Sequence, residues 1–277
     1  MGAVTGPEDE GAQVRRMGRL TEPAAEELLT YGEYLALPEL LSIQRLLSDP
    51  PVHDELLFIT VHQAYELWFK QLIFELESVR DLLFEGEAER ARHFLTRVRA
   101  IERVLIEHIE VLETMTPQDF LEFRSLLSPA SGFQSAQFRE VEFVSGLKEP
   151  RYLKQLAGTP EELERLARRL EEPTVWDGFG ALLEANGLDM PADDESTRMD
   201  SLVRMAGDKK YAALFAVSEG LLDHDEAFAH WRLHHVLMVE RQIGAKPGTG
   251  GSAGVGYLKT TLDKRFFPEL WALRSAL

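Results

Sequence analysis

The sequence predicts an all-α protein built as a bundle of long helices. Residues 53–80 contain neither proline nor glycine over about seven to eight helical turns. Along residues 88–115, apolar side chains recur at three- and four-residue spacings, as on one face of a helix. No segment shows the two-residue alternation of a half-buried strand, and there is no internal repeat or low-complexity tract. Long helices of this kind suit a bundle.

The composition narrows the classes of function. The chain has 277 residues, enough to bury a sizeable core, and its formal net charge of −17 argues against a general nucleic-acid binder. No apolar stretch approaches the roughly 20 residues of a membrane span, and the N-terminus lacks the apolar core of a signal peptide. We therefore expect a cytoplasmic protein without a nucleic-acid or membrane partner. Because there is no cysteine, any metal must be held by His, carboxylate, Tyr or Met.

The N-terminal region consists of a tail followed by a short helical segment. Residues 1–25 are small, charged and aperiodic, which predicts a mobile tail. We expect residues 26–277 to form a single all-α domain. Its first segment, TYGEYL at 30–35, leads into an amphipathic helix at 38–47 that is opened by Pro38.

The predicted helix at 53–80 carries a histidine, His62, inside an apolar turn. Apolar side chains cover every face at the start of this helix, which is typical of a buried helix. One interpretation is a core histidine bonded to a neighbouring carbonyl. The other is a pocket histidine with Phe58 one turn before it on the same face. By contrast, His93 and His108 of the next helix sit among charges, which predicts a solvated face for both.

The segment TPQD at 116–119 has the features of a helix start: a capping residue, proline at the first helical position, and an acid that completes a capping box. Phe120 and Arg124 follow four residues apart on one face. They can present an aromatic surface and a guanidinium to one pocket. Alternatively, Arg124 is a surface residue paired with Glu122 or Asp119.

The residue pattern changes in the middle of the chain, where long apolar helices give way to loops and charged segments. Residues 128–135, SPASGFQS, form an ordered-looking loop that leads into a helix at 136–144. Residues 148–207 contain two charged helical pieces, 160–170 and 175–185, beside a turn-rich PADDEST segment. We predict a small peripheral helical insertion at 148–207.

Residues 209–243 form a third long helix, or a closely linked pair with a break near Gly220. This segment carries His224, His230, His234 and His235. No histidine follows a glutamate by three residues, so the Glu-x-x-His pattern of di-iron bundles is absent, as is the HExxH pattern of zinc proteases. A helical haem site requires one axial histidine. His235 shares a face with Trp231, but spacing alone leaves His234, or no metal at all, as alternatives.

After this helix, residues 248–254 read GTGGSAG. The segment formally matches G-x-G-x-x-A, but it follows a helix where a dinucleotide-binding motif requires a strand. Its glycines suggest a loop, for example a lid, that lets backbone approach a ligand. A mere connection is the alternative, and the hydroxyls of Thr249 and Ser252 favour the ligand loop. A last amphipathic helix is predicted at 266–277.

Four blocks in this order resemble the tryptophan 2,3-dioxygenase family. They are TYGEYL, FITVHQAYELWFKQLIFEL, LETMTPQDFLEFRSLLSPASGFQSAQFR and HWRLHHVLMVERQIGAKPGTGGSAG, and they extend from about residue 30 to about residue 260. The resemblance implies a bundle that encloses a b-type haem, with ferrous iron in the active form. It also implies insertion of O2 across the indole C2–C3 bond of L-tryptophan to give N-formyl-L-kynurenine, the first step of the kynurenine pathway.

The resemblance assigns cofactor contacts to matched positions. The histidine of W-R-x-x-H, the axial ligand of the haem iron, matches His235 rather than His234. Trp231, on the same face, is expected to contact the cofactor. Ser131 and Gly132 match the loop beside the haem.

Substrate contacts follow in the same way. Phe58 and Phe120 match two walls between which the indole is expected to stack, and His62 matches the hydrogen-bond partner of the indole N–H. Arg124 matches the partner of the substrate carboxylate, a role for which the planar guanidinium is suited. Thr249 matches the residue that contacts the ammonium and carboxylate. We expect His62 to position the substrate, because a histidine with a pKa of ~6.5 does not readily deprotonate an indole N–H.

The same resemblance implies a homotetramer built as a dimer of dimers. Tyr31, Tyr34 and Leu35 resemble residues that reach into the pocket of a neighbouring subunit. Two other functions remain: a haem dioxygenase of this fold that acts on a modified tryptophan or another indole, and a helical interaction scaffold whose histidines are only core residues.

Overall fold

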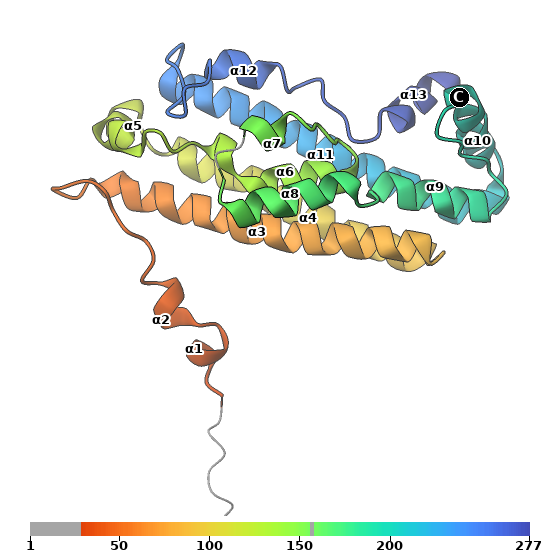
Figure 1. Ribbon diagram of the computed structural model, residues 1–277, viewed down its shortest axis with the longest axis horizontal. Helices are drawn as coiled ribbons and strands as arrows, with labels where there is room; N and C mark the ends of the chain where they lie inside the picture. Colours follow the sequence, from red (N-terminus) through yellow and green to blue (C-terminus); the bar gives the residue numbers. More distant parts are fainter. Residues whose placement is uncertain (1–28, 156–157) are drawn as a thin grey trace, which may run out of the picture. The chain divides into compact units, whose positions relative to one another are not determined.

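The computed structural model describes residues 29–155 and 158–277, and throughout this part of the chain it contains helices and no strand, which confirms the all-α prediction (Figure 1). The predicted tail at 1–25 lies outside the described residues. Chain contacts divide the protein into two units, one that ends at Ile43 and one that spans Gln44–Leu277. Among the described helices, none combines the length and the apolar character needed to cross a membrane.

The first unit contains two short helices, α1 (Tyr31–Tyr34) and α2 (Leu37–Leu40). The prediction of a helix at 38–47 is wrong, since α2 ends at Leu40. The reason lies in the second unit, where the backbone N–H groups of Leu47 and Ser48 donate to the Glu55 carboxylate at 2.7 and 3.0 Å. These donors are therefore not available to a helical ladder.

Three long helices form the frame of the second unit: α3 (His53–Phe84), α4 (Ala88–Glu113) and α11 (Ala212–Ile243). α3 and α11 each pack against α4 (Figure 1). Their apolar faces meet in one core, in which Leu72, Leu76 and Val98 have no exposed surface. The predicted long helices are confirmed.

The break predicted near Gly220 is absent, because α11 continues through this residue. A Cβ atom added at Gly220 would lie 3.0 Å from Cδ1 of Leu95 on α4. The glycine therefore allows close approach of α4 and α11 instead of ending the helix.

Shorter helices cover this frame. They are α5 (Pro117–Arg124), α6 (Ala136–Ser145), α7 (Tyr152–Gln155), α8 (Pro160–Glu171), α9 (Val175–Ala185), α10 (Glu195–Gly207), α12 (Val255–Lys259) and α13 (Pro268–Ala276), with 3-10 turns at Ser125–Leu127, Gly132–Gln134 and Lys209–Tyr211. The predicted helices at 160–170 and 175–185 are confirmed, and α10 is an additional helix that Asp194 caps. Phe179 and Leu202 join the main core. The domain bounds, 1–25 and 26–277 with an insertion at 148–207, stay a prediction.

Candidate active site

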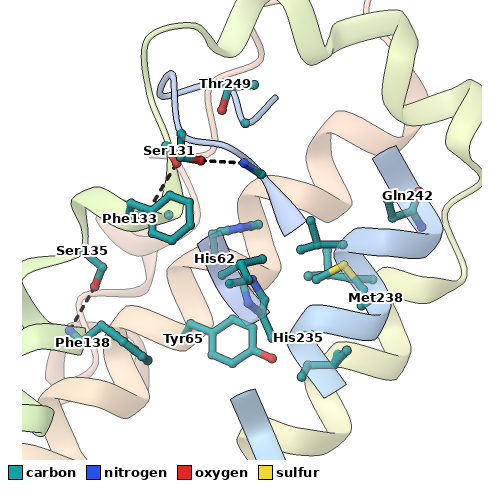
Figure 2. Close-up of a pocket in the computed structure, with 18 of the residues that line it drawn as sticks. His62, Tyr65, Ser131, Phe133, Ser135, Phe138, His235, Met238, Gln242 and Thr249 are labelled. Atoms are coloured by element: carbon teal, nitrogen blue, oxygen red, sulfur yellow. Dashed lines mark hydrogen bonds between the residues drawn. The ribbon is translucent and has the colours of Figure 1, made fainter. Parts of the chain in front are cut away.

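A cavity of about 250 Å³ lies within the second unit, among α3, α5, α6, α11 and the glycine loop (Figure 2). It brings together residues that are far apart in the sequence. The predicted site residues that line it are Phe58, His62, Phe120, Arg124, Ser131, Gly132, Trp231, His235 and Thr249. Tyr31, Tyr34 and Leu35 belong to the first unit, where they are 76%, 73% and 39% exposed.

His62 projects from α3 into the cavity (Figure 2). Its Nδ1 lies 2.7 Å from the carbonyl oxygen of Phe58. Because a carbonyl only accepts, Nδ1 carries the proton, and in the neutral ring Nε2 is left as an acceptor. Burial lowers the pKa of His62, although the Phe58 carbonyl and Glu66 act in the opposite direction. The ring is thus bonded to a neighbouring carbonyl and also lines a pocket, so the two interpretations of this histidine do not exclude each other.

Phe58 and Phe120 form an aromatic surface beside His62. The Phe58 ring lies 4.0 Å from the His62 ring and is stacked 5.7 Å from the Phe120 ring. The fully buried Phe123 makes an edge contact with the Phe58 ring. A planar ring between two others needs about 7 Å, twice the contact distance of ~3.5 Å. The 5.7 Å between the centroids of Phe58 and Phe120 is less than this, so no planar ring fits between them in this structure. The expected stacking of an indole between the two rings is therefore replaced by one continuous aromatic wall that faces the cavity.

Arg124 ends α5, which begins with the predicted capping box of Thr116 and Asp119. Its guanidinium donates to the backbone carbonyl of Pro247 and has no carboxylate partner among the described residues. The alternative pairing with Asp119 or Glu122 is not formed. An arginine that lines a cavity without a carboxylate can bind an anionic ligand.

The glycine loop packs on the loop that precedes α6. Thr249 Oγ1 donates to the carbonyl of Ala130 at 2.6 Å. A Cβ at Gly250 would lie 2.7 Å from Cβ of Ser131, so only glycine permits this approach. Thr249 and Ser131 thereby meet at one side of the cavity (Figure 2).

On the wall formed by α11, His235 lines the cavity whereas His234 is exposed. The rings of Trp231 and His235 are stacked, with centroids 5.0 Å apart and an interplanar angle of 7°. Burial, followed by the neighbouring His62, lowers the pKa of His235 to about 4. The imidazole is therefore neutral at neutral pH, and within the described chain neither ring nitrogen has a hydrogen-bond partner.

Sequence reasoning missed several charged and polar residues of the cavity. Glu142 of α6 is paired with Arg139 at 2.7 Å and with Arg232 of α11 at 2.9 Å, and all three are buried. In the sequence, these charged residues are typical of a solvent-exposed helix face. Their pairing is visible only in the structure, where side chains of α6 and α11 meet. Gln242, seven residues after His235, also lines the cavity and donates to the carbonyl of Met115.

The prediction of a solvated His108 is wrong. This residue is half-buried, its Nδ1 is fully buried, and its ring meets the edge of Tyr65 at 5.6 Å. His93 is exposed, as predicted. Among the described residues, no group of three or more His, Asp or Glu side chains is arranged to hold a metal ion.

Comparison with known proteins gives a consistent result. The family model described as tryptophan 2,3-dioxygenase matches residues 20–201 and 201–277. A tryptophan 2,3-dioxygenase of Nocardioides sp. is 57% identical over 255 residues, which cover 90% of this chain and 95% of that protein. Proteins of the same name from Herpetosiphon aurantiacus and Caulobacter vibrioides are each 45% identical, over 91% and 90% of this chain and 99% and 98% of their own lengths.

Proposed function

Since the chain belongs to the tryptophan 2,3-dioxygenase family, we propose that its cavity binds haem b through His235 and holds L-tryptophan beside His62. The protein is an oxidoreductase that adds both atoms of O2 across the indole C2–C3 bond of L-tryptophan. The product is N-formyl-L-kynurenine, and the reaction is the first step of tryptophan catabolism by the kynurenine pathway. The observation that carries the proposal is the neutral, unpartnered imidazole of His235 in the cavity.

The residues of the cavity fit a haem group. A neutral imidazole with a free nitrogen is the form of histidine that binds haem iron. Two buried polar atoms of cavity residues on α11 also lack a partner in the described structure: Arg232 Nε and Gln242 Oε1. Unpaired buried polar groups are unfavourable unless a ligand or water completes them. Haem, when bound, supplies the iron that activates O2.

The substrate ring is oriented by His62 and the aromatic wall. The Nε2 lone pair of neutral His62 is an acceptor for the indole N–H, because Nδ1 is engaged by Phe58. Phe58 and Phe120 offer a flat apolar surface to the indole. His62 holds the proton of the indole nitrogen in place and does not remove it.

The amino acid end of the substrate is bound at Arg124 and Thr249. In the structure both side chains donate to backbone carbonyls, those of Pro247 and Ala130. A substrate carboxylate is a stronger acceptor for a guanidinium than a carbonyl is, and it replaces this contact on binding. The Thr249 hydroxyl, which both donates and accepts, serves the ammonium and the carboxylate.

We also propose a homotetramer, built as a dimer of dimers, in which the first unit of one subunit completes the pocket of another. The exposed aromatic side chains of Tyr31 and Tyr34 and the half-exposed Leu35 support this role. The cytoplasmic location stays a prediction from composition.

The direct test is incubation of the haem-loaded protein with L-tryptophan and isotopically labelled O2. We expect N-formyl-L-kynurenine that carries both labelled atoms. Haem uptake without product from L-tryptophan, but with product from another member of an indole panel, would favour the other indole dioxygenase. A chain that takes up no haem and forms no product would refute the proposal and favour the interaction scaffold.

A further inference from the structure

A fully buried histidine, His224, lies on α11 outside the cavity. Its Nδ1 is 2.5 Å from Oε1 of Glu102 on α4, and its Nε2 is 2.9 Å from Oγ of Ser145 at the end of α6. These residues are 0%, 1% and 0% exposed, respectively, and none of them lines the cavity. The arrangement has the hydrogen-bond order of a hydrolytic triad. Without access for a substrate, however, it cannot be a hydrolase site.

The hydrogen bonds determine where the protons lie. Ser145 Oγ donates its only proton to the carbonyl of Val141 at 2.8 Å, so Nε2 of His224 must donate to Oγ. With Nε2 protonated, the contact between Nδ1 and Glu102 needs one further proton. This proton resides on either the imidazole or the carboxyl group. In both cases the pair is neutral as a whole, which suits a site without water.

The surrounding charges favour this protonated, neutral pair. Burial raises the pKa of Glu102, and His224 opposes this effect. Asp225 of α11 raises the pKa further, whereas Arg99 of α4, which is paired with Asp223, lowers it slightly.

No other element packed on the pair brings a free charge to it in the described part of the chain. From α6 the nearest charge, Glu142, is neutralised by Arg139 and Arg232. The chain before α13 contributes the ring of Phe266, stacked 4.9 Å from His224. Glu102 Oε2 has no partner in the described structure, which also disfavours the ionised carboxylate.

A line of ring contacts connects this pair to the cavity. Along α11, the ring of Phe228 lies 6.3 Å from His224 and 5.9 Å from Trp231, which in turn is stacked on His235 at 5.0 Å. From α6, the helix that ends with Ser145, Phe138 contacts both Phe228 and Trp231, at 5.4 and 5.2 Å. The rotation of α11 about its axis and its position along that axis, relative to α4 and α6, therefore determine how Trp231 and His235 are oriented.

We propose that Glu102, His224 and Ser145 are positioning residues, which share one proton that fixes α11 against α4 and α6 and so orients Trp231 and His235 in the cavity. The shared proton follows from the fold alone. Its link to His235 rests on the function proposed above.

The proposal has a consequence for the pH dependence of unfolding. Above pH ~6.5 the unfolded chain has ionised Glu102 and neutral His224, one proton fewer than the folded pair. Folding then takes up a proton, so the unfolding equilibrium constant rises about tenfold per pH unit until the folded pair loses its proton. Between about pH 4.3 and 6.5 the unfolded His224 is itself protonated, and this contribution vanishes.

The experiment compares urea unfolding of the full-length chain, without added haem, for wild type and E102Q between pH 5 and 9. The E102Q side chain keeps a hydrogen bond to His224 but removes the shared proton. Above pH ~6.5 we expect the tenfold-per-unit dependence to be present in wild type and missing in E102Q. Below it, wild type and E102Q both lose stability as the unfolded His62 and His235 take up protons, because the folded forms of these two residues have lowered pKa values. E102Q should lose stability more steeply than wild type, because its unfolded His224 also takes up a proton that the folded one lacks. E75Q, which changes another buried carboxyl group between α3 and α4, should follow wild type. Parallel profiles for wild type and E102Q would overturn the shared proton.

The link to His235 is read from the absorption maximum of the haem-loaded chain as a function of pH. We expect a shift in wild type and in E75Q at the pH where unfolding shows that the pair loses its proton, and none in E102Q. A maximum that is independent of pH in all three proteins would overturn the link. A chain that takes up no haem would overturn both the link and the proposed function, while the unfolding profiles would still decide the shared proton.

Discussion

Two histidines of α11, the buried His224 and the half-buried His235, differ in what surrounds their ring nitrogens. Near the middle of the helix, His224 has Glu102 on one nitrogen and Ser145 on the other. At the cavity end, eleven residues later, His235 stacks on Trp231 and has no hydrogen-bond partner in the described chain. Both are placed by the same helix in the same bundle.

This difference shows that burial alone does not identify a functional histidine. A buried ring with both nitrogens satisfied contributes to the fold, because removing it leaves other polar groups unpaired. A half-buried ring with free nitrogens in a cavity wall has no such structural role and is available to a ligand. We therefore expect substitutions around His224 to affect stability, and substitutions around the cavity to affect binding and turnover.

The largest expected effect is that of His224→Ala on stability. It leaves Glu102 buried without its partner, which costs about 3–5 kcal/mol in the free energy of unfolding. Urea unfolding of the haem-free chain measures this loss. In the same chain His235→Ala breaks no hydrogen bond, and we expect a loss of about 1 kcal/mol or less. Equal losses of unfolding free energy in the two variants would contradict the distinction between a structural His224 and a ligand-binding His235.

At the cavity, Arg124→Lys keeps the charge but loses the planar fork that binds a carboxylate. A charge-assisted hydrogen bond contributes about 1.5–3 kcal/mol, so KM for L-tryptophan should rise roughly 10- to 100-fold. The free energy of unfolding should stay within about 0.5 kcal/mol of wild type. Arg92→Lys, at an exposed arginine paired with Glu89, is the matched control. An unchanged KM would argue against Arg124 as the carboxylate partner.

A smaller effect is expected for His62→Ala, which removes the proposed acceptor for the indole N–H. The loss of one hydrogen bond, about 1–1.5 kcal/mol, lowers kcat/KM about tenfold and leaves haem content unchanged. Steady-state kinetics with haem quantification measures both. A variant with full haem content and no detectable turnover would contradict the positioning role and indicate acid–base chemistry instead.

The smallest effect concerns how the affinity for L-tryptophan falls in acidic solution. Burial lowers the pKa of His62, so the neutral ring persists as the pH falls through about 6.5 and is lost only at lower pH. Affinity for L-tryptophan should accordingly stay constant past pH ~6.5 and fall only in more acidic solution, whereas His62→Ala should lack this decrease. A decrease in the variant equal to that of wild type would assign it to another group.

Much of the fold follows from local sequence signals. The capping box at Thr116, the proline starts of α5 and α8, and the apolar spacing of α4 all predict elements that the structure contains. The errors arise where tertiary contacts override local preference. Glu55 takes the backbone donors of a predicted helix at 38–47, and Leu95 explains Gly220 as a packing glycine.

Residue spacing alone predicted less of the candidate site than of the fold. His234 and His235 differ by about 100° around the helix axis, and only the packing of α11 decides which of them meets the cavity. The resemblance of the four blocks to one family chose His235, and the structure has it in the cavity wall. Arg139 and Arg232 were not recognised, because their pairing through Glu142 joins two helices that are distant in sequence.

The main proposal is that His235, the half-buried cavity histidine without a hydrogen-bond partner in the described chain, holds the haem iron. The most direct measurement is the absorption spectrum of haem titrated into wild type and His235→Gly, with and without added imidazole. Wild type should bind an equimolar amount of haem with the spectrum of histidine ligation, and His235→Gly should do so only when imidazole is supplied. The same spectrum in His235→Gly without imidazole would contradict the claim.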